Sequence, residues 1–139
     1  MSGKKIAVRY YSKSGNTKKL AERIAAVAGC NAETTDVDLR EKVDILFLGA
    51  AVYWAGIDKS VKEYIERLDK SMVGKVVIFS TSALAERAVP SIKKHLTAKK
   101  IKVVAEDFYC HGQFASLHRG KPDEKDLVAV EEFTRKIIG

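Results

Sequence analysis

The chain has 139 residues, of which 46% are hydrophobic and 31% are charged, proportions typical of a folded globular protein rather than a disordered one. The length fits one domain over 1–139, and no apolar run is long enough to cross a bilayer. The net charge is +7, but the basic residues are not gathered in an arm or tail. We therefore interpret them as a solvated surface rather than as a nucleic-acid binding site. With only two, widely separated cysteines and no signal-like segment, we expect a cytoplasmic protein with free thiols.

Strand-like and helix-like segments alternate along the sequence. In chain order the patterns predict a strand over 4–11, a helix over about 18–28, a weak strand around 33–37, a strand over 43–51, a helix over about 59–68, a strand over 75–80, helical residues to about 96, a strand over 101–109 and a helix over about 123–138. Gly29 is expected to end the first helix. Either Asp58 alone or a capping box of Ser60 and Glu63 starts the second, and Pro90 either restarts or kinks the third.

This alternation predicts parallel strands joined by right-handed crossovers, with helices on both faces of the sheet. In open sheets of this kind, ligands bind beyond the carboxyl ends of the strands, at the switch point. Three loops leave those ends centrally, at 12–17, 52–58 and 80–83. We therefore expect the functional site there.

The loop at 12–17, Ser-Lys-Ser-Gly-Asn-Thr, joins the first strand to the first helix. Amides in the first turn of a helix lack partners within the helix, and the helix dipole favours an anion there. The hydroxyls of Ser12, Ser14 and Thr17 can donate to the same oxygens, while Gly15 lets the backbone come close. A phosphate group is the expected ligand. An ordinary capped turn is the alternative, because serine and threonine also favour helix starts.

Missing motifs exclude several other phosphate chemistries. The sequence contains neither the Walker loop G-x-x-x-x-G-K-[ST] nor the dinucleotide fingerprint G-x-G-x-x-G. A cysteine phosphatase needs an arginine six residues after its cysteine, but those positions hold Asp36 and Ser116. The strands at 4–11 and 43–51 end without the aspartates of a phospho-accepting response regulator. No metal site is expected.

Several segments resemble the flavodoxin family over essentially the whole chain. The segment 6–17 resembles the first strand and FMN phosphate loop of that family, Thr/Ser-x-Thr/Ser-Gly-x-Thr, and 47–54 resembles its second flavin loop. The segments 108–112 and 120–123 are similar to stretches common in small flavodoxin-like proteins. The resemblance implies a flavodoxin-like three-layer sandwich, α/β in class, with a five-stranded parallel sheet of order 2-1-3-4-5 and helices on both faces.

The same resemblance implies noncovalently bound FMN and a set of residues that contact it. Tyr53 and Trp54 are expected beside the flavin ring, with packing of the loop as the alternative role of these aromatics. No residue is assigned a catalytic role. The residues expected to bind the cofactor are Ser12, Lys13, Ser14, Gly15, Asn16 and Thr17 in the first loop, Val52, Tyr53, Trp54 and Ala55 in the second, and Ser80, Thr81 and Ser82 in the third.

Two departures from the family pattern bear on function. No aromatic follows the strand at 75–80, which leaves one ring face open or covered by 110–118. The site rim is basic where family carriers are usually acidic, and its cations are Lys13, Lys59, Arg87, Arg119 and Lys121. We expect an electron carrier that docks on acidic redox proteins. The alternatives are a small FMN oxidoreductase acting on an acidic, quinone-like or porphyrinogen-like substrate, and a flavin-free binding module.

Overall fold

The computed structural model describes residues 4–12, 15–53, 56–82, 89–111, 120 and 122–139, with the backbone alone at 51–53, 56–57, 82 and 111. Strands and helices alternate within these ranges. The strands are β1 (Ile6–Tyr10), β2 (Ala32–Thr34), β3 (Val43–Tyr53), β4 (Gly56–Ile57), β5 (Val73–Ser82) and β6 (Phe108–His111). The helices are α1 (Asn16–Ala28), α2 (Lys59–Arg67), α3 (Val89–Ala98) and α4 (Glu124–Ile138).

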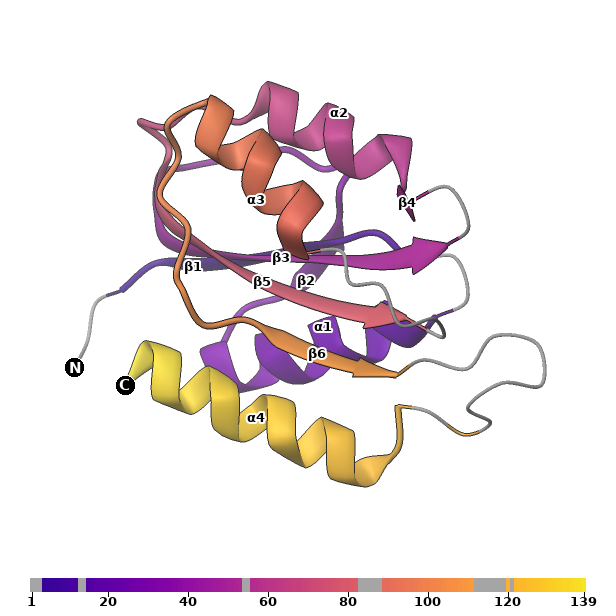
Figure 1. Cartoon of the computed structure of the whole chain (residues 1–139). Coiled ribbons are helices and arrows are strands. Elements are labelled where there is room, and N and C mark those ends of the chain that lie inside the picture. The colour runs from indigo at the N-terminus through magenta and orange to yellow at the C-terminus, as the bar shows by residue number, and fades with distance from the viewer. Residues whose placement is uncertain (1–3, 13–14, 54–55, 83–88, 112–119, 121) are drawn as a thin grey trace.

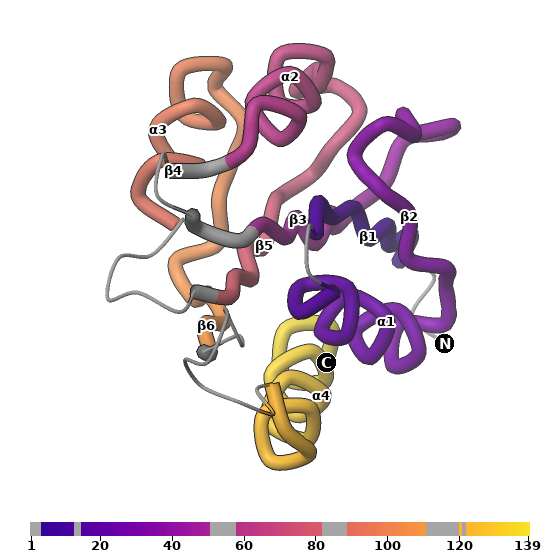
Figure 2. The backbone as a smooth tube through the Cα atoms, turned by 90° about the vertical axis from the view of Figure 1, so that its right-hand side faces the viewer, coloured from indigo at the N-terminus to yellow at the C-terminus, as the bar shows by residue number. Residues whose placement is uncertain are grey.

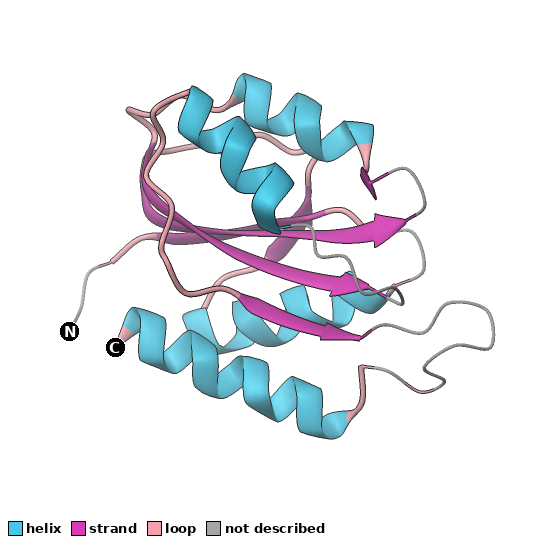
Figure 3. Cartoon of the chain, in the orientation of Figure 1, coloured by secondary structure: helices cyan, strands magenta, loops and turns pink. Residues whose placement is uncertain are grey.

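Five strands form a parallel sheet in the order β2-β1-β3-β5-β6. Counted along the chain without the two-residue β4, this is the order 2-1-3-4-5. Helices α2 and α3 cover one face of the sheet, and α1 and α4 cover the other (Figures 1 and 3). The structure confirms the predicted flavodoxin-like three-layer α/β sandwich.

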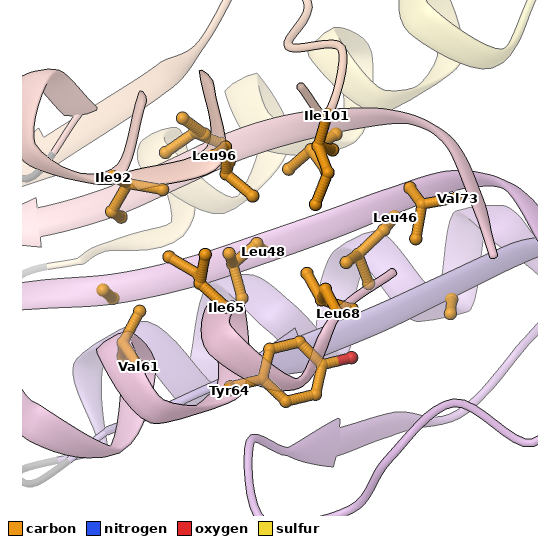
Figure 4. Close-up of a cluster of buried hydrophobic side chains, with 14 of the residues drawn as sticks. Leu46, Leu48, Val61, Tyr64, Ile65, Leu68, Val73, Ile92, Leu96 and Ile101 are labelled. Carbon is orange, nitrogen blue, oxygen red and sulfur yellow. The ribbon is translucent and has the colours of Figure 1, made fainter. Parts of the chain in front are cut away.

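Alternating side chains of the central strands build two separate hydrophobic clusters. Along β3, Leu46 and Leu48 face the α2/α3 layer (Figure 4), whereas Ile45 and Phe47 face the α1/α4 layer. All four are at most 1% exposed, and burying a side chain of this size stabilises the fold by roughly 1.5–3 kcal/mol. The sheet between the two clusters is therefore a rigid platform for the loops at its carboxyl edge.

Three predicted segments differ from the structure. The strand predicted over 75–80 is longer, since β5 runs from Val73 to Ser82 through part of the loop predicted at 80–83. The sequence predicts a loop after 51, but β3 runs on to Tyr53 and β4 turns back antiparallel to it. The predicted strand over 101–109 is largely wrong. Val103 forms an isolated bridge with Val76, and regular pairing begins only where Phe108 meets Phe79. Between these two pairings the chain advances five residues, from 103 to 108, while β5 advances three, from 76 to 79. The two extra residues break the ladder.

The helix ends follow their local chemistry. Gly29 ends α1 in the left-handed conformation at φ 76°, as predicted, because glycine adopts positive φ without steric strain. Of the two predicted starts for α2, the structure has Asp58, whose carboxylate accepts from the amide of Ser60 at 2.8 Å. Pro90 is the second residue of α3, within its first turn. Asp123 and Asp126 form a reciprocal capping box at the start of α4.

A buried arginine joins the β1–β2 edge of the sheet to the chain that follows β2. Arg9 is 4% exposed, and its guanidinium pairs with Glu33 at 3.1 Å. It also donates to the carbonyl oxygens of Val37 at 2.7 Å and Asp38 at 3.2 Å. Its charge is thus paired and hydrogen-bonded, as burial requires. The Asp38 carboxylate, which is exposed, forms a further ion pair with Arg67 of α2 at 2.8 Å.

Tyr64 of α2 lies at the boundary between this polar edge and the α2/α3 cluster. Its side chain is 1% exposed, and its hydroxyl has no hydrogen-bond partner among the described residues (Figure 4). Arg67 lies over its ring, 5.5 Å from the centroid. Burial raises the pKa of Tyr64 to about 12, because the phenolate would lose its hydration. The hydroxyl therefore adds little to stability at neutral pH.

We expect Tyr64→Phe to be at least as stable as the wild type at pH 8, because the substitution removes an unpaired buried hydroxyl. Above pH 10 the unfolded tyrosine ionises while the folded one keeps its proton, so the wild type loses stability as the pH rises toward 12. At pH 11 the wild type should have lost about 1 kcal/mol more than the variant. Urea unfolding of both proteins at pH 8 and 11 measures the difference, and an equal loss in both would contradict the assignment.

Candidate functional site

The described strand ends beside the predicted site segments lie along the carboxyl edge of the sheet, which Figure 2 views end-on. Where β1 ends, the amide of Tyr11 donates to the carbonyl of Gly49 in β3 at 3.1 Å. Farther along the same edge, Val52 of β3 pairs with Ser82 of β5, and Ser82 pairs with His111 of β6. The backbone thus aligns the ends of four strands. The loop that follows β1 leads directly into α1.

Gly15, at the end of the first loop, has a left-handed conformation. Gly15 has φ 92° and immediately precedes α1, and its amide donates to the Ser12 hydroxyl at 2.9 Å. An L-residue would be strained at this φ, which is a physical reason for glycine at this position. The Ser12 hydroxyl accepts this bond and keeps its own proton for another acceptor. Lys13 and Ser14 lie outside the described residues.

The start of α1 is open where those of α2 and α4 are closed. Its N-cap residue is Gly15, no side-chain cap bond is found among the described residues, and the first turn has no acidic residue. Asp58 and Asp123 cap the other two helices with their carboxylates. Lys18 and Lys19 are exposed on the first turns of α1. The dipole of α1 and these cations together favour an anion at this end of the helix.

Thr17, in the first turn of α1, is bonded to a residue of the third predicted segment. Its Oγ1 lies 2.9 Å from Oγ1 of Thr81 in β5, and the two side chains are 0% and 1% exposed. Within the described residues, neither hydroxyl has a further partner. Both were predicted as site residues on separate loops, but no sequence signal indicates the bond between them, because 64 positions separate them.

Ser80, next to Thr81, faces the opposite layer. Alternation along β5 places Ile78 in the α2/α3 cluster and Phe79 in the α1/α4 cluster, so the side chain of Ser80 points toward α2 and α3. It is fully buried, and its hydroxyl has no partner in the described part of the chain. Its backbone pairs with Ala50 and Tyr109. This hydroxyl can bond a further polar group at the edge.

Only the backbone of the second predicted segment is described, and only in part. Val52 and Tyr53 end β3 and pair with Ile57 and Gly56 of β4. This short hairpin leads into Asp58 at the start of α2 and keeps the segment at the carboxyl edge. Trp54 and Ala55 lie outside the described residues. Asn16, the first residue of α1, is half-buried beside Gly15.

The described residues show neither a metal cluster nor a membrane-spanning helix. They contain no group of three or more histidine, cysteine, aspartate or glutamate side chains that could hold a metal ion. None of their helices is long and apolar enough to cross a membrane. The donors gathered at the carboxyl edge are instead hydroxyls and main-chain amides, which suit an anionic oxygen ligand.

Comparisons with known proteins agree with the observed fold. The chain is 26% identical over 137 residues to the uncharacterized protein MJ0298 of Methanocaldococcus jannaschii, with 88% of this chain and 90% of that protein covered. The solved structure of a flavodoxin from the domain Archaea has a TM-score of 0.75 at 17% identity, covering 96% of this chain and 95% of the other. Oxidised Flavodoxin 2 from Bacillus cereus has a TM-score of 0.69 at 19% identity, with 94% and 95% covered. Residues 7–130 match the family model for the flavodoxin domain, and the chain therefore belongs to the flavodoxin family.

Proposed function

We propose that the chain binds FMN noncovalently at the carboxyl edge of its sheet and carries electrons between redox proteins. The observation that carries this proposal is the uncapped start of α1, which follows a loop of the phosphate-binding pattern. A phosphate monoester there would accept from main-chain amides and hydroxyls at the positive end of the helix. The family to which the chain belongs supports the choice of FMN.

The described donors fit a phosphate at this position. Ser12 keeps its hydroxyl proton after accepting from Gly15, and the pair of Thr17 and Thr81 leaves one further hydroxyl proton unpaired. Neutral donors suffice because the helix dipole already provides a positive field. The absence of an acidic residue from the first turn of α1 avoids repulsion of the phosphate. We propose that Lys13, Ser14 and Asn16 complete the phosphate end of the site.

The remaining predicted residues are proposed to hold the ring end. Val52, Tyr53, Trp54 and Ala55 would line one side of the flavin, and Ser80 and Ser82 the edge of β5 that faces it, whereas Thr81 belongs with Thr17 at the phosphate end. An aromatic face against the ring disfavours its electron-rich reduced form and lowers its potential. When bound, FMN supplies the electron chemistry, and the chain's own residues bind it, orient it and exclude water from it.

The charge around the site supports an acidic partner. Lys18 and Lys19 on α1 and Lys59 at the start of α2 are all exposed near the carboxyl edge. Lys59 lies 3.7 Å from Glu63, an exposed ion pair that solvent and salt weaken. With a net charge of +7, the protein attracts acidic surfaces, and cations beside the site orient them toward it.

Titration of the protein with FMN tests the cofactor directly. Flavin fluorescence should be quenched on binding, and replacing Ser14 and Thr17 together with valine should weaken binding by about 1–3 kcal/mol per lost hydroxyl donor. Thr97→Val, on the exposed last turn of α3, is the matched control and should leave the affinity unchanged. If the wild type binds no FMN, the chain is a flavin-free module; if the double variant binds as tightly, the phosphate lies elsewhere.

The reduction behaviour of the FMN-loaded protein separates a carrier from a reductase. A carrier should take up its two electrons in separate steps at different potentials during a dithionite titration followed by absorbance. Uptake of both electrons at one potential, with turnover of a soluble quinone, would instead indicate the oxidoreductase. The titration needs no knowledge of the physiological partner.

Charge reversal tests the docking surface. In the reduced FMN-loaded protein, Lys18→Glu with Lys19→Glu should slow oxidation by the anionic oxidant ferricyanide about tenfold at low ionic strength. The matched control is Lys42→Glu with Lys136→Glu, which changes the net charge equally at exposed positions near the opposite edge. High salt should reduce the difference between the two variants, because it screens exposed charges. Equal rates at low salt would contradict a docking role for the α1 lysines.

A further inference from the structure

We propose that Thr81 is a positioning residue for the anionic end of the ligand: it donates its hydroxyl proton to Thr17 and so directs the Thr17 proton toward the phosphate. The inference rests on the proposed function and deepens it at the same site. It begins from the bond between the two Oγ1 atoms, 2.9 Å apart, which joins the helix behind the phosphate loop to the end of β5. Neither residue is exposed by more than 1%.

Counting protons gives the reason for the pair. Two hydroxyls bring two protons, and a single bond between them uses one, whichever group donates. Within the described residues neither hydroxyl has another partner, so one buried proton is left without an acceptor. Leaving a buried donor unpaired costs stability, and an acceptor supplied by a ligand removes that cost. The pair therefore holds one hydroxyl proton that can be donated to an acceptor on a bound ligand.

The fold places the two ends of the pair differently with respect to an anion. Thr17 lies in the first turn of α1, beside the main-chain amides and the left-handed Gly15. Thr81 lies within β5, in register with Ala51 and Cys110 of the neighbouring strands. An anion bound at the start of α1 would therefore lie nearer to the Thr17 hydroxyl than to the Thr81 hydroxyl. It favours the arrangement in which Thr81 donates to Thr17 and Thr17 donates outward.

Strand alternation fixes Thr81 in this role. Val77 and Phe79 face the α1/α4 layer, so the side chain two residues later faces the same layer and meets α1. The neighbouring Ser80 faces away from α1 and cannot replace Thr81. When Thr81 donates to Thr17, it polarises the Thr17 hydroxyl. The bond that Thr17 donates to the phosphate becomes stronger, because hydrogen bonds in series reinforce one another.

The experiment compares FMN with riboflavin, which has the same ring and ribityl chain but no phosphate. We expect Thr81→Val to raise the Kd for FMN about tenfold and to change that for riboflavin less than about twofold, because only the phosphate accepts from Thr17. Thr81→Ser keeps the hydroxyl and should bind both flavins as the wild type does. The phosphorus NMR signal of bound FMN should shift in Thr81→Val and stay in place in Thr81→Ser.

A double-variant cycle separates positioning from stability. Thr17→Val and Thr81→Val should each lower the urea midpoint of the ligand-free protein, because each leaves one buried hydroxyl without its partner. The combined variant has no hydroxyl left to pair and should recover most of that loss. Its FMN affinity should nevertheless equal that of Thr17→Val alone, because Thr81 acts through Thr17.

Three results would overturn the proposal. Unchanged FMN affinity in Thr81→Val would show that the pair does not serve the ligand. An equal loss for FMN and riboflavin would assign Thr81 to the scaffold or to the ring. A wild type that binds neither flavin would remove the proposed function as well. The last result differs from the first two, in which the wild type binds FMN.

Discussion

The proposed site depends on a helix start that is left open. The first-turn amides of any helix need acceptors, and proteins usually provide them from a neighbouring side chain. In α2 and α4 a carboxylate does so. In α1 the residue before the helix is Gly15, which has no side chain to offer, and the nearby Ser12 hydroxyl bonds the Gly15 amide instead. The residue before α1 therefore provides no side-chain acceptor for its first turn, and the other proposed contacts are arranged around that turn.

An open helix start has to be held in place by something other than its own cap. Behind it, α1 packs on the sheet through the cluster that includes Leu20, Ile24 and Phe47. At its first turn, Thr17 bonds β5 directly. On the far side of β1, the paired guanidinium of Arg9 joins the sheet edge to the chain after β2. The element bearing the donors is thus fixed on more than one side, which limits the ordering that ligand binding must impose.

Much of the architecture could be predicted because it depends on local patterns. The period of the apolar residues gives the alternation of strands and helices, and the handedness of crossovers then leaves few topologies. Gly29 and Asp58 mark helix ends through chemistry confined to a few neighbouring residues. The position of the site follows equally from topology, because parallel strands bring their carboxyl ends to one edge.

What could not be predicted depends on contacts between distant residues. The sequence around Thr17 contains no information about Thr81, and the same is true of the pairing between Val103 and Val76. The predicted strand over 101–109 is apolar enough to pair along its length, but its register with β5 contains two extra residues. The β4 hairpin was missed because its two residues show no periodicity.

The lengths of the outermost strands have a consequence for self-association. A sheet grows from its edges, where main-chain donors and acceptors of the last strand can pair with another molecule. In the part of the chain that the structure describes, the long strands β3 and β5 lie in the middle, whereas the edges are β2, with three residues, and β6, with four. A second copy adding a strand at either of these described edge strands would gain few backbone bonds. The short outer strands of the described sheet thus offer little backbone for edge-to-edge growth.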